Sequence, residues 1–178
     1  GFMAWAPTRR VRRELKIRDG FLVVVLFWMV LSLFGAIPLW LAVRPDMSFT
    51  EATFEAVSGL TTTGATVLVG LDTLPHAILF WRVLLHWMGG MGIIVLAVAV
   101  LPMLGVGGMQ LYRAETPGPI KDSKLTPRIR ETAKALWYLY VSLTLISALL
   151  FWAAGTSVFD AVGNAFSSIA TGGFANHD

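Results

Sequence analysis

The stretch "SGLTTTGATVL", residues 58–68, lies between two long apolar segments and carries three consecutive threonines followed by a glycine. The residues just before it predict a helix over 49–60, because Ser48 and Glu51 have the spacing of a capping box. This helix would be roughly 18 Å long, which is too short to cross a bilayer. Since many of its side chains are apolar, we expect it to enter the membrane and to return through residues 61–66 as a re-entrant loop.

The composition is that of a membrane protein. The 178 residues are 56% hydrophobic and only 14% charged, whereas a soluble domain carries about 25% charged residues. Segments without formal charge lie at 21–43, 83–109 and 135–159. Each is long enough for a membrane-spanning helix, which needs about 20 apolar residues. We therefore expect an all-α integral membrane protein with spanning helices over 21–43, 77–104 and 135–156.

The basic residues predict the orientation of the chain. All but two of the 14 lysines and arginines fall within 1–20 or 105–134, and the positive-inside rule assigns such segments to the cytoplasm. The N-terminus would then be cytoplasmic, and the re-entrant loop would enter from the opposite side. The same basic clusters would also suit contact with anionic lipid or with a cytosolic partner. Their position argues against nucleic acid as a partner, and the absence of cysteine excludes disulfides and cysteine-based metal sites.

The second predicted spanning helix contains two unusual features. Arg82 lies about one turn inside its outer end, where it could either extend to the interface or pair with a buried carboxylate of the short helix, Glu55 being the first choice. The sequence "GGMG", residues 89–92, favours close packing of helices. A hinge or break in the helix is the alternative.

An internal repeat follows the third spanning helix. "FDAV", residues 159–162, resembles "FEAV", residues 54–57, and both runs continue through small and hydroxyl residues to Thr-Gly. We expect a second short helix over 158–169 and a second return over 170–174. Counted from the phenylalanine, the glycine comes 10 residues later in the first copy and 13 later in the second, if Gly172 is the equivalent one. That slip would fit a second short helix longer by about one turn. The chain would thus hold one complete helix–pore-loop–helix repeat and a second that lacks its last helix.

Residues 61–66 and 170–174, here called the first and second glycine segments, suggest an ion filter. Each would follow the C-terminal end of a short helix, which carries a partial negative charge. Backbone carbonyls, helped by threonine hydroxyls, can replace the water shell of a dehydrated alkali cation. Glycine allows the unusual backbone angles that such a segment needs. In a soluble protein the same residues would more often be a turn or a helix cap, but the spanning helices, the short helix and the repetition favour the filter.

These motifs together resemble one known family, the Trk-type potassium uptake proteins of the TrkH/TrkG branch of the superfamily of potassium transporters. The resemblance covers nearly the whole chain from about Asp19. It is carried by "FEAVSGLTTTGATVL", "GGMGIIVLAVAVLPMLGVGGMQLYRAETPGP", "KLTPRIRETAK" and "FDAVGNAFSSIATGGF". It implies four helix–pore-loop–helix repeats around one ion path, with K⁺ as the transported ion. Transferred residue by residue, the filter would comprise Thr61, Thr62, Thr63, Gly64, Ala65, Ala170, Thr171, Gly172 and Gly173. Whether Gly172 or Gly173 is equivalent to Gly64 stays open.

The resemblance also implies partners and a location. Family members are dimeric, lie in the bacterial inner membrane and are gated by a cytosolic nucleotide-binding ring of the TrkA type, for which the basic residues of 113–134 are on the correct side. Family members have four filter segments and this chain has two, so the resemblance is that of a fragment. Whether transport is passive or coupled as symport is open.

Other functions remain as alternatives. A sodium path, or a mixed potassium and sodium path, could use the same scaffold. An intramembrane enzyme is a distant alternative: His76, His86 and His177 lack the spacing of metal ligands, and none of the common hydrolase or protease motifs occurs. A purely structural anchor would not need a repeated glycine segment. We expect a transporter rather than an enzyme, without an organic cofactor.

Overall fold

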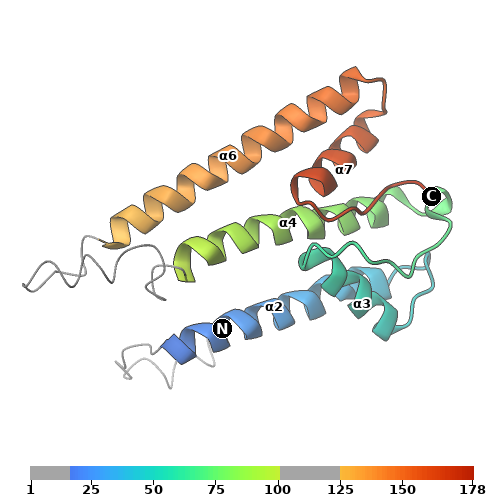
Figure 1. The fold of residues 1–178 in the computed structure, drawn as a ribbon. Coiled ribbons are helices and arrows are strands. Elements are labelled where there is room, and N and C mark those ends of the chain that lie inside the picture. The colour runs from blue at the N-terminus through green and yellow to red at the C-terminus, as the bar shows by residue number, and fades with distance from the viewer. Residues whose placement is uncertain (1–16, 101–124) are drawn as a thin grey trace, which may run out of the picture.

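The computed structural model describes residues 17–100 and 125–178, and every regular element in them is helical (Figure 1). The elements are α2 (Ile17–Trp40), α3 (Phe49–Leu60), the short 3₁₀ helix η1 (Leu71–Thr73), α4 (His76–Val100), α6 (Leu125–Ala153) and α7 (Val158–Ile169). Most of the predicted basic segments 1–20 and 105–134 lie outside the described residues.

Three long helices form the frame, and α4 lies between α2 and α6 (Figure 1). They contain 24, 25 and 29 residues, which corresponds to roughly 36–44 Å and exceeds the hydrocarbon thickness of a bilayer. Compared with the predicted spans, α2 begins and ends earlier, and α6 begins about ten residues earlier. Among the described residues, Glu131–Ala153 has the length and apolar composition of a spanning helix, and Val24–Trp40 is a shorter apolar stretch.

The two short helices α3 and α7 lie toward the same end of the long helices (Figure 1). Each begins with a serine cap. Ser48 Oγ accepts a hydrogen bond from the Glu51 backbone N–H, and Glu51 accepts one from the Ser48 N–H at 2.8 Å. Ser157 Oγ likewise accepts from the Asp160 N–H at 3.1 Å. The capping box predicted at Ser48 is therefore present, and α7 carries an equivalent serine cap.

The predicted extra turn in the second short helix is wrong, because α3 and α7 both contain 12 residues. The caps show the true register of the repeat. It pairs Ser48 with Ser157 and Gly64 with Gly173, at a constant separation along the chain. The "FEAV" and "FDAV" runs are not equivalent in this register, since they occupy different turns of their helices.

Small residues allow α3 to pack closely against α2 and α4. Ala52, Ala56 and Leu60 of α3 are fully buried, and they cluster with residues of α2 and α4. Gly89 of α4 touches the end of α3, because a Cβ atom there would lie 2.0 Å from the Leu60 carbonyl oxygen. The described helix α4 runs unbroken through residues 89–92, so the structure favours the packing interpretation of "GGMG" over the hinge.

The outer faces of the frame are apolar. Large side chains of α2 such as Phe27 and Phe34 are 59% and 65% exposed, and Leu150 and Trp152 of α6 are similarly exposed. A continuous surface of this kind is stable against lipid or further protein rather than water.

Candidate functional site

The glycine segments have an unusual backbone that is repeated in the two copies. Thr62 and Thr171 both adopt the left-handed conformation, with φ of 54° and 56°. Gly64 and Gly173 follow two positions later with φ of 77° and 92°. Left-handed backbone costs a residue with a side chain about 1–2 kcal/mol, so its occurrence at equivalent threonines indicates a conformation that the surrounding structure enforces.

The N–H groups of residues 61–63 and 170–173 are held by the preceding short helix. Thr62 and Thr63 donate to the carbonyl oxygens of Gly59 and Ser58, and the second copy makes the equivalent bonds. Gly173 in addition donates to Ser167 Oγ at 3.1 Å. Among residues 17–100 and 125–178, no group donates a hydrogen bond to the carbonyl oxygens of 62–65 or 171–173. Hydrogen bonds from the described residues therefore do not occupy these oxygens.

The two segments meet at one point. A Cβ atom on Gly64 would lie 1.8 Å from the carbonyl oxygen of Gly172, so the segments are too close there for any residue but glycine at position 64. Thr61 and Thr63 next to this contact are exposed, and their hydroxyl groups hydrogen bond to each other at 2.8 Å. Thr171 Oγ1 donates to the carbonyl of Ala170. The nine residues predicted for the filter thus occupy two equivalent segments, which the structure brings into contact at their glycines.

A buried ion pair lies behind the first segment. Arg82 Nε is 2.7 Å from Glu55 Oε1, and both side chains are at most 1% exposed. Glu55 also accepts from Thr66 Oγ1 at 2.8 Å and from the Val67 N–H at 3.2 Å. Arg82 additionally approaches the Ala175 carbonyl at 3.4 Å. The arginine therefore does not extend to the interface, and it connects the first short helix with the chain that leaves each glycine segment.

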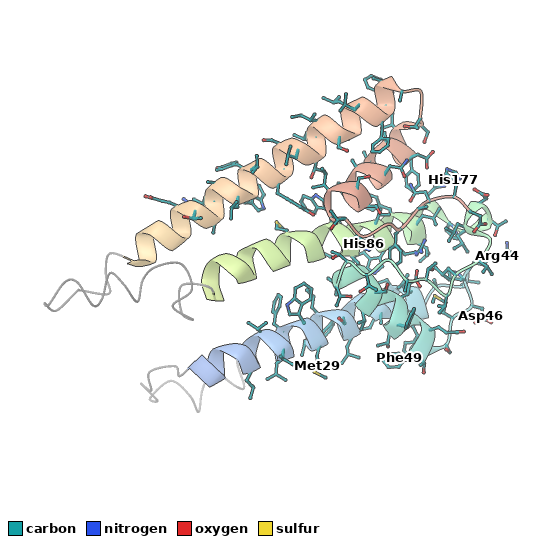
Figure 2. All side chains as sticks on the ribbon, in the orientation of Figure 1. Met29, Arg44, Asp46, Phe49, His86 and His177 are labelled. Carbon is teal, nitrogen blue, oxygen red and sulfur yellow. The ribbon has the colours of Figure 1, made fainter. Side chains whose placement is uncertain are left out.

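Two further features of the site escaped the sequence analysis. His86 is completely buried against the second segment, and Figure 2 shows it beside the chain that follows α7. His177 joins the two copies by hydrogen bonds to Asp72 at 2.5 Å and Asp160 at 3.1 Å. The contacts of His86 with Gly172 and of His177 with Asp72 were concealed because each joins residues separated by about half the chain or more.

Hydrogen bonds within the exposed cluster around His177 change the pKa values of its members. Hydrogen bonds to Asp72 and then to Asp160 raise the pKa of the His177 imidazole. A hydrogen bond from Ser157 is the main cause that lowers the pKa of the Asp160 carboxyl. In the part of the chain that the structure describes, no group of three or more histidine or acidic side chains could hold a metal ion, and His76, His86 and His177 do not form a common site.

Short capped helices that enter beside long apolar ones, each followed by a glycine segment, define an integral membrane protein built from helix–pore-loop–helix repeats. A comparison with family models identifies the particular family: residues 1–178 match the TrkH model, described as a cation transport protein, and the chain belongs to this family.

Relatives and a solved structure agree with this assignment. The chain is 65% identical over 178 residues to "Trk system potassium uptake protein TrkH" of Vibrio parahaemolyticus and 63% identical to the protein of that name from Escherichia coli. TrkG of Escherichia coli is 46% identical over 174 residues. The crystal structure of the potassium transporter TrkH from Vibrio parahaemolyticus matches 99% of the chain with a TM-score of 0.81 and 57% identity. The chain spans 37% of the length of the two TrkH relatives and 34% of the crystallised chain.

Proposed function

We propose that the two glycine segments supply part of the potassium path of a Trk-type uptake protein. The observation that carries this proposal is the division of backbone groups in both copies. The N–H groups of residues 61–63 and 170–173 donate to the short helices, and the carbonyl oxygens of 62–65 and 171–173 accept no hydrogen bond from the described residues. Carbonyl oxygens in this state can replace the hydration shell of an alkali cation.

The charge of the site suits a monovalent ion. The glycine segments contain no carboxylate, and the nearby Glu55 is neutralised by Arg82. Carboxylate cages bind divalent ions such as Ca²⁺, whereas neutral oxygens hold a cation weakly enough to release it. The C-terminal ends of α3 and α7 directly precede the segments and contribute a partial negative charge.

Potassium is preferred over sodium because the TrkH and TrkG relatives are named potassium uptake proteins. The direct test uses a chimaera, in which residues 1–178 replace the matching stretch of Vibrio parahaemolyticus TrkH. We expect this chimaera to restore growth of a potassium-uptake-deficient bacterium at low potassium. Flux measurements should then show a clear preference for K⁺ over Na⁺. Equal uptake of the two ions would instead establish the mixed path, and the absence of uptake by a well-expressed chimaera would contradict the proposal.

The proposal includes a location and partners. The chain would lie in the bacterial inner membrane with its N-terminus in the cytoplasm, as the basic residues predict. A TrkA-type nucleotide-binding ring would contact basic residues of 113–134, half of which lie outside the described residues, and the full-length protein would be a homodimer. Replacing the lysines and arginines of this segment with glutamine should weaken co-purification of a TrkA-type subunit with the chimaera. Unchanged co-purification would place the contact elsewhere.

A further inference from the structure

His86 is a buried polar side chain that the potassium path as described does not use. It lies on α4 and is 0% exposed. Neither of its ring nitrogens has a hydrogen-bond partner among the described residues. A buried polar group without partners is costly, so its shape and position at this site need an explanation.

The histidine ring occupies the space of a missing side chain. A Cβ atom on Gly172 would lie 2.1 Å from His86 Nε2 and 2.3 Å from Cδ2. The equivalent position in the first copy is Thr63, which carries a full side chain. Gly172 does not have a positive φ, unlike Gly64 and Gly173. It is therefore glycine because of its neighbour and not because of its backbone angles.

The His86 ring also packs on Phe174, the last residue of the second segment. The centroids of His86 and Phe174 are 4.1 Å apart, and the Arg82 guanidinium carbon lies 4.3 Å over the Phe174 ring. Arg82 is fixed in turn by its bond to Glu55. The buried side chains of His86, Phe174 and Arg82 therefore contact one another in series, and Arg82 links this series to the ion pair of the first repeat.

We propose that His86 is a positioning residue for the second glycine segment, and that it acts as one half of a complementary pair with Gly172. The ring sets how far Gly172 can retreat toward α4. Because the carbonyl of Gly172 touches Gly64, the position of Gly172 also determines the contact between the two segments. The inference rests on the proposed function, since it states that His86 sets the spacing of the carbonyl oxygens along a potassium path.

The test is a double-mutant cycle in the chimaera. Gly172→Ala alone should raise the KM for potassium about tenfold or reduce the preference for K⁺ over Na⁺ by a similar factor, because the new methyl group displaces the segment. His86→Ala alone should raise KM several-fold while membrane abundance stays within about twofold of the unsubstituted chimaera. In the double variant, the KM or the ion preference that Gly172→Ala disturbs should be at least about threefold closer to that of the unsubstituted chimaera. The reason is that the effects of substitutions at residues in contact are not additive.

A matched control distinguishes the effect of the position of His86 from the general effect of removing a histidine from α4. His76 begins the same helix, and its ring packs on Phe159 at 4.5 Å, away from the glycine segments. His76→Ala should leave KM and ion preference unchanged and should not rescue Gly172→Ala. His86→Gln retains much of the reach of the ring and should be milder than His86→Ala.

The outcomes are decisive in each case. Additive effects of the two substitutions, or a His86→Ala variant that transports like His76→Ala, would overturn the inference. If His86→Ala does not accumulate, the double variant decides: recovery of membrane abundance on adding Gly172→Ala supports the pair, and no recovery contradicts it. If the unsubstituted chimaera transports no potassium, the proposed function fails, and the same comparison of abundance and thermal stability still tests whether the two residues are complementary.

Discussion

Gly64 lies directly against the carbonyl oxygen of Gly172, at a distance that leaves no space for a Cβ atom on Gly64. The two residues are far apart in sequence and belong to different copies of the repeat. Their contact fixes the distance between two sets of backbone oxygens that are free of hydrogen bonds from the described residues. Substitutions around this contact therefore test the site most directly.

The first prediction concerns Gly64. In the chimaera, Gly64→Ser should lower potassium uptake about tenfold or more, because the new Cβ would lie 1.8 Å from the Gly172 carbonyl oxygen. Membrane abundance should change little. Uptake at low external potassium and immunoblots of the membrane fraction measure the two quantities.

Gly155 offers a matched control for this substitution. Its φ is 97°, but a Cβ atom there would meet nothing within 4 Å. Gly155→Ala therefore adds the strain of left-handed backbone without a collision and should transport normally. Equal defects in the two variants would mean that strain, and not the contact with Gly172, disturbs uptake.

The second prediction concerns the Arg82–Glu55 pair. Arg82→Ala leaves a buried carboxylate without its partner, and such changes destabilise proteins by about 3–5 kcal/mol. We expect folded protein in the membrane to fall more strongly than ion preference per molecule changes. Fluorescence-detected size-exclusion chromatography and thermal melting in detergent measure the folded fraction. Normal abundance together with altered selectivity would reverse this assignment.

A double variant refines that test. Combining Arg82→Met with Glu55→Gln removes both charges, so it should be less destabilised than Arg82→Ala alone. If the double variant is instead the less stable of the two, the hydrogen bonds that the Glu55 carboxylate accepts from Thr66 and Val67 contribute more than the removal of its unpaired charge.

The third prediction compares two glycines of α4. Gly89→Ala should destabilise the fold by about 1–3 kcal/mol or more, because its Cβ would collide with the Leu60 backbone at 2.0 Å. Gly92→Ala would place the Cβ 3.2 Å from the Trp28 ring, which can move. The melting temperature should therefore fall clearly more for Gly89→Ala. Similar melting temperatures would show that α3 can shift away from α4 at little cost.

The fourth prediction concerns pH. The pKa of His177 is raised by Asp72 and Asp160 in the folded protein, so the protonated imidazole stabilises the fold. This contribution is fully present below about pH 6.5, the unfolded value, and it disappears as the pH rises through the raised folded-state pKa. His177→Gln should therefore lower the melting temperature at pH 6 more than at pH 9. A difference that is independent of pH would rule out the charged interaction.

The sequence allowed the fold class and the short helices to be predicted for a local reason. Caps and apolar segments are properties of neighbouring residues, so Ser48, Glu51 and the charge-free runs were sufficient. The register of the repeat was not predicted, because the two copies were matched through "FEAV" and "FDAV", which are not equivalent in the structure. Aligning the capping serines instead, Ser48 with Ser157, would have paired Gly64 with Gly173 directly.

The contacts that organise the candidate site were predicted only in part. The Arg82–Glu55 pair could be anticipated because a buried charge needs a partner of opposite sign. The bond of Arg82 to Ala175 and the packing of His86 on Gly172 could not, since they join residues that are far apart in sequence and belong to different repeats. No local sequence pattern predicts a contact between residues so far apart in the chain.

Helix α4 has a consequence for how such a protein is made. By sequence it closes the first repeat, yet its residues also receive the second copy: Gly90 faces Ala170, and His86 faces Gly172. Because a chain emerges from the ribosome N-terminus first, this surface is synthesised before α7 exists. The second copy therefore folds against a helix that has already been synthesised as part of the first copy.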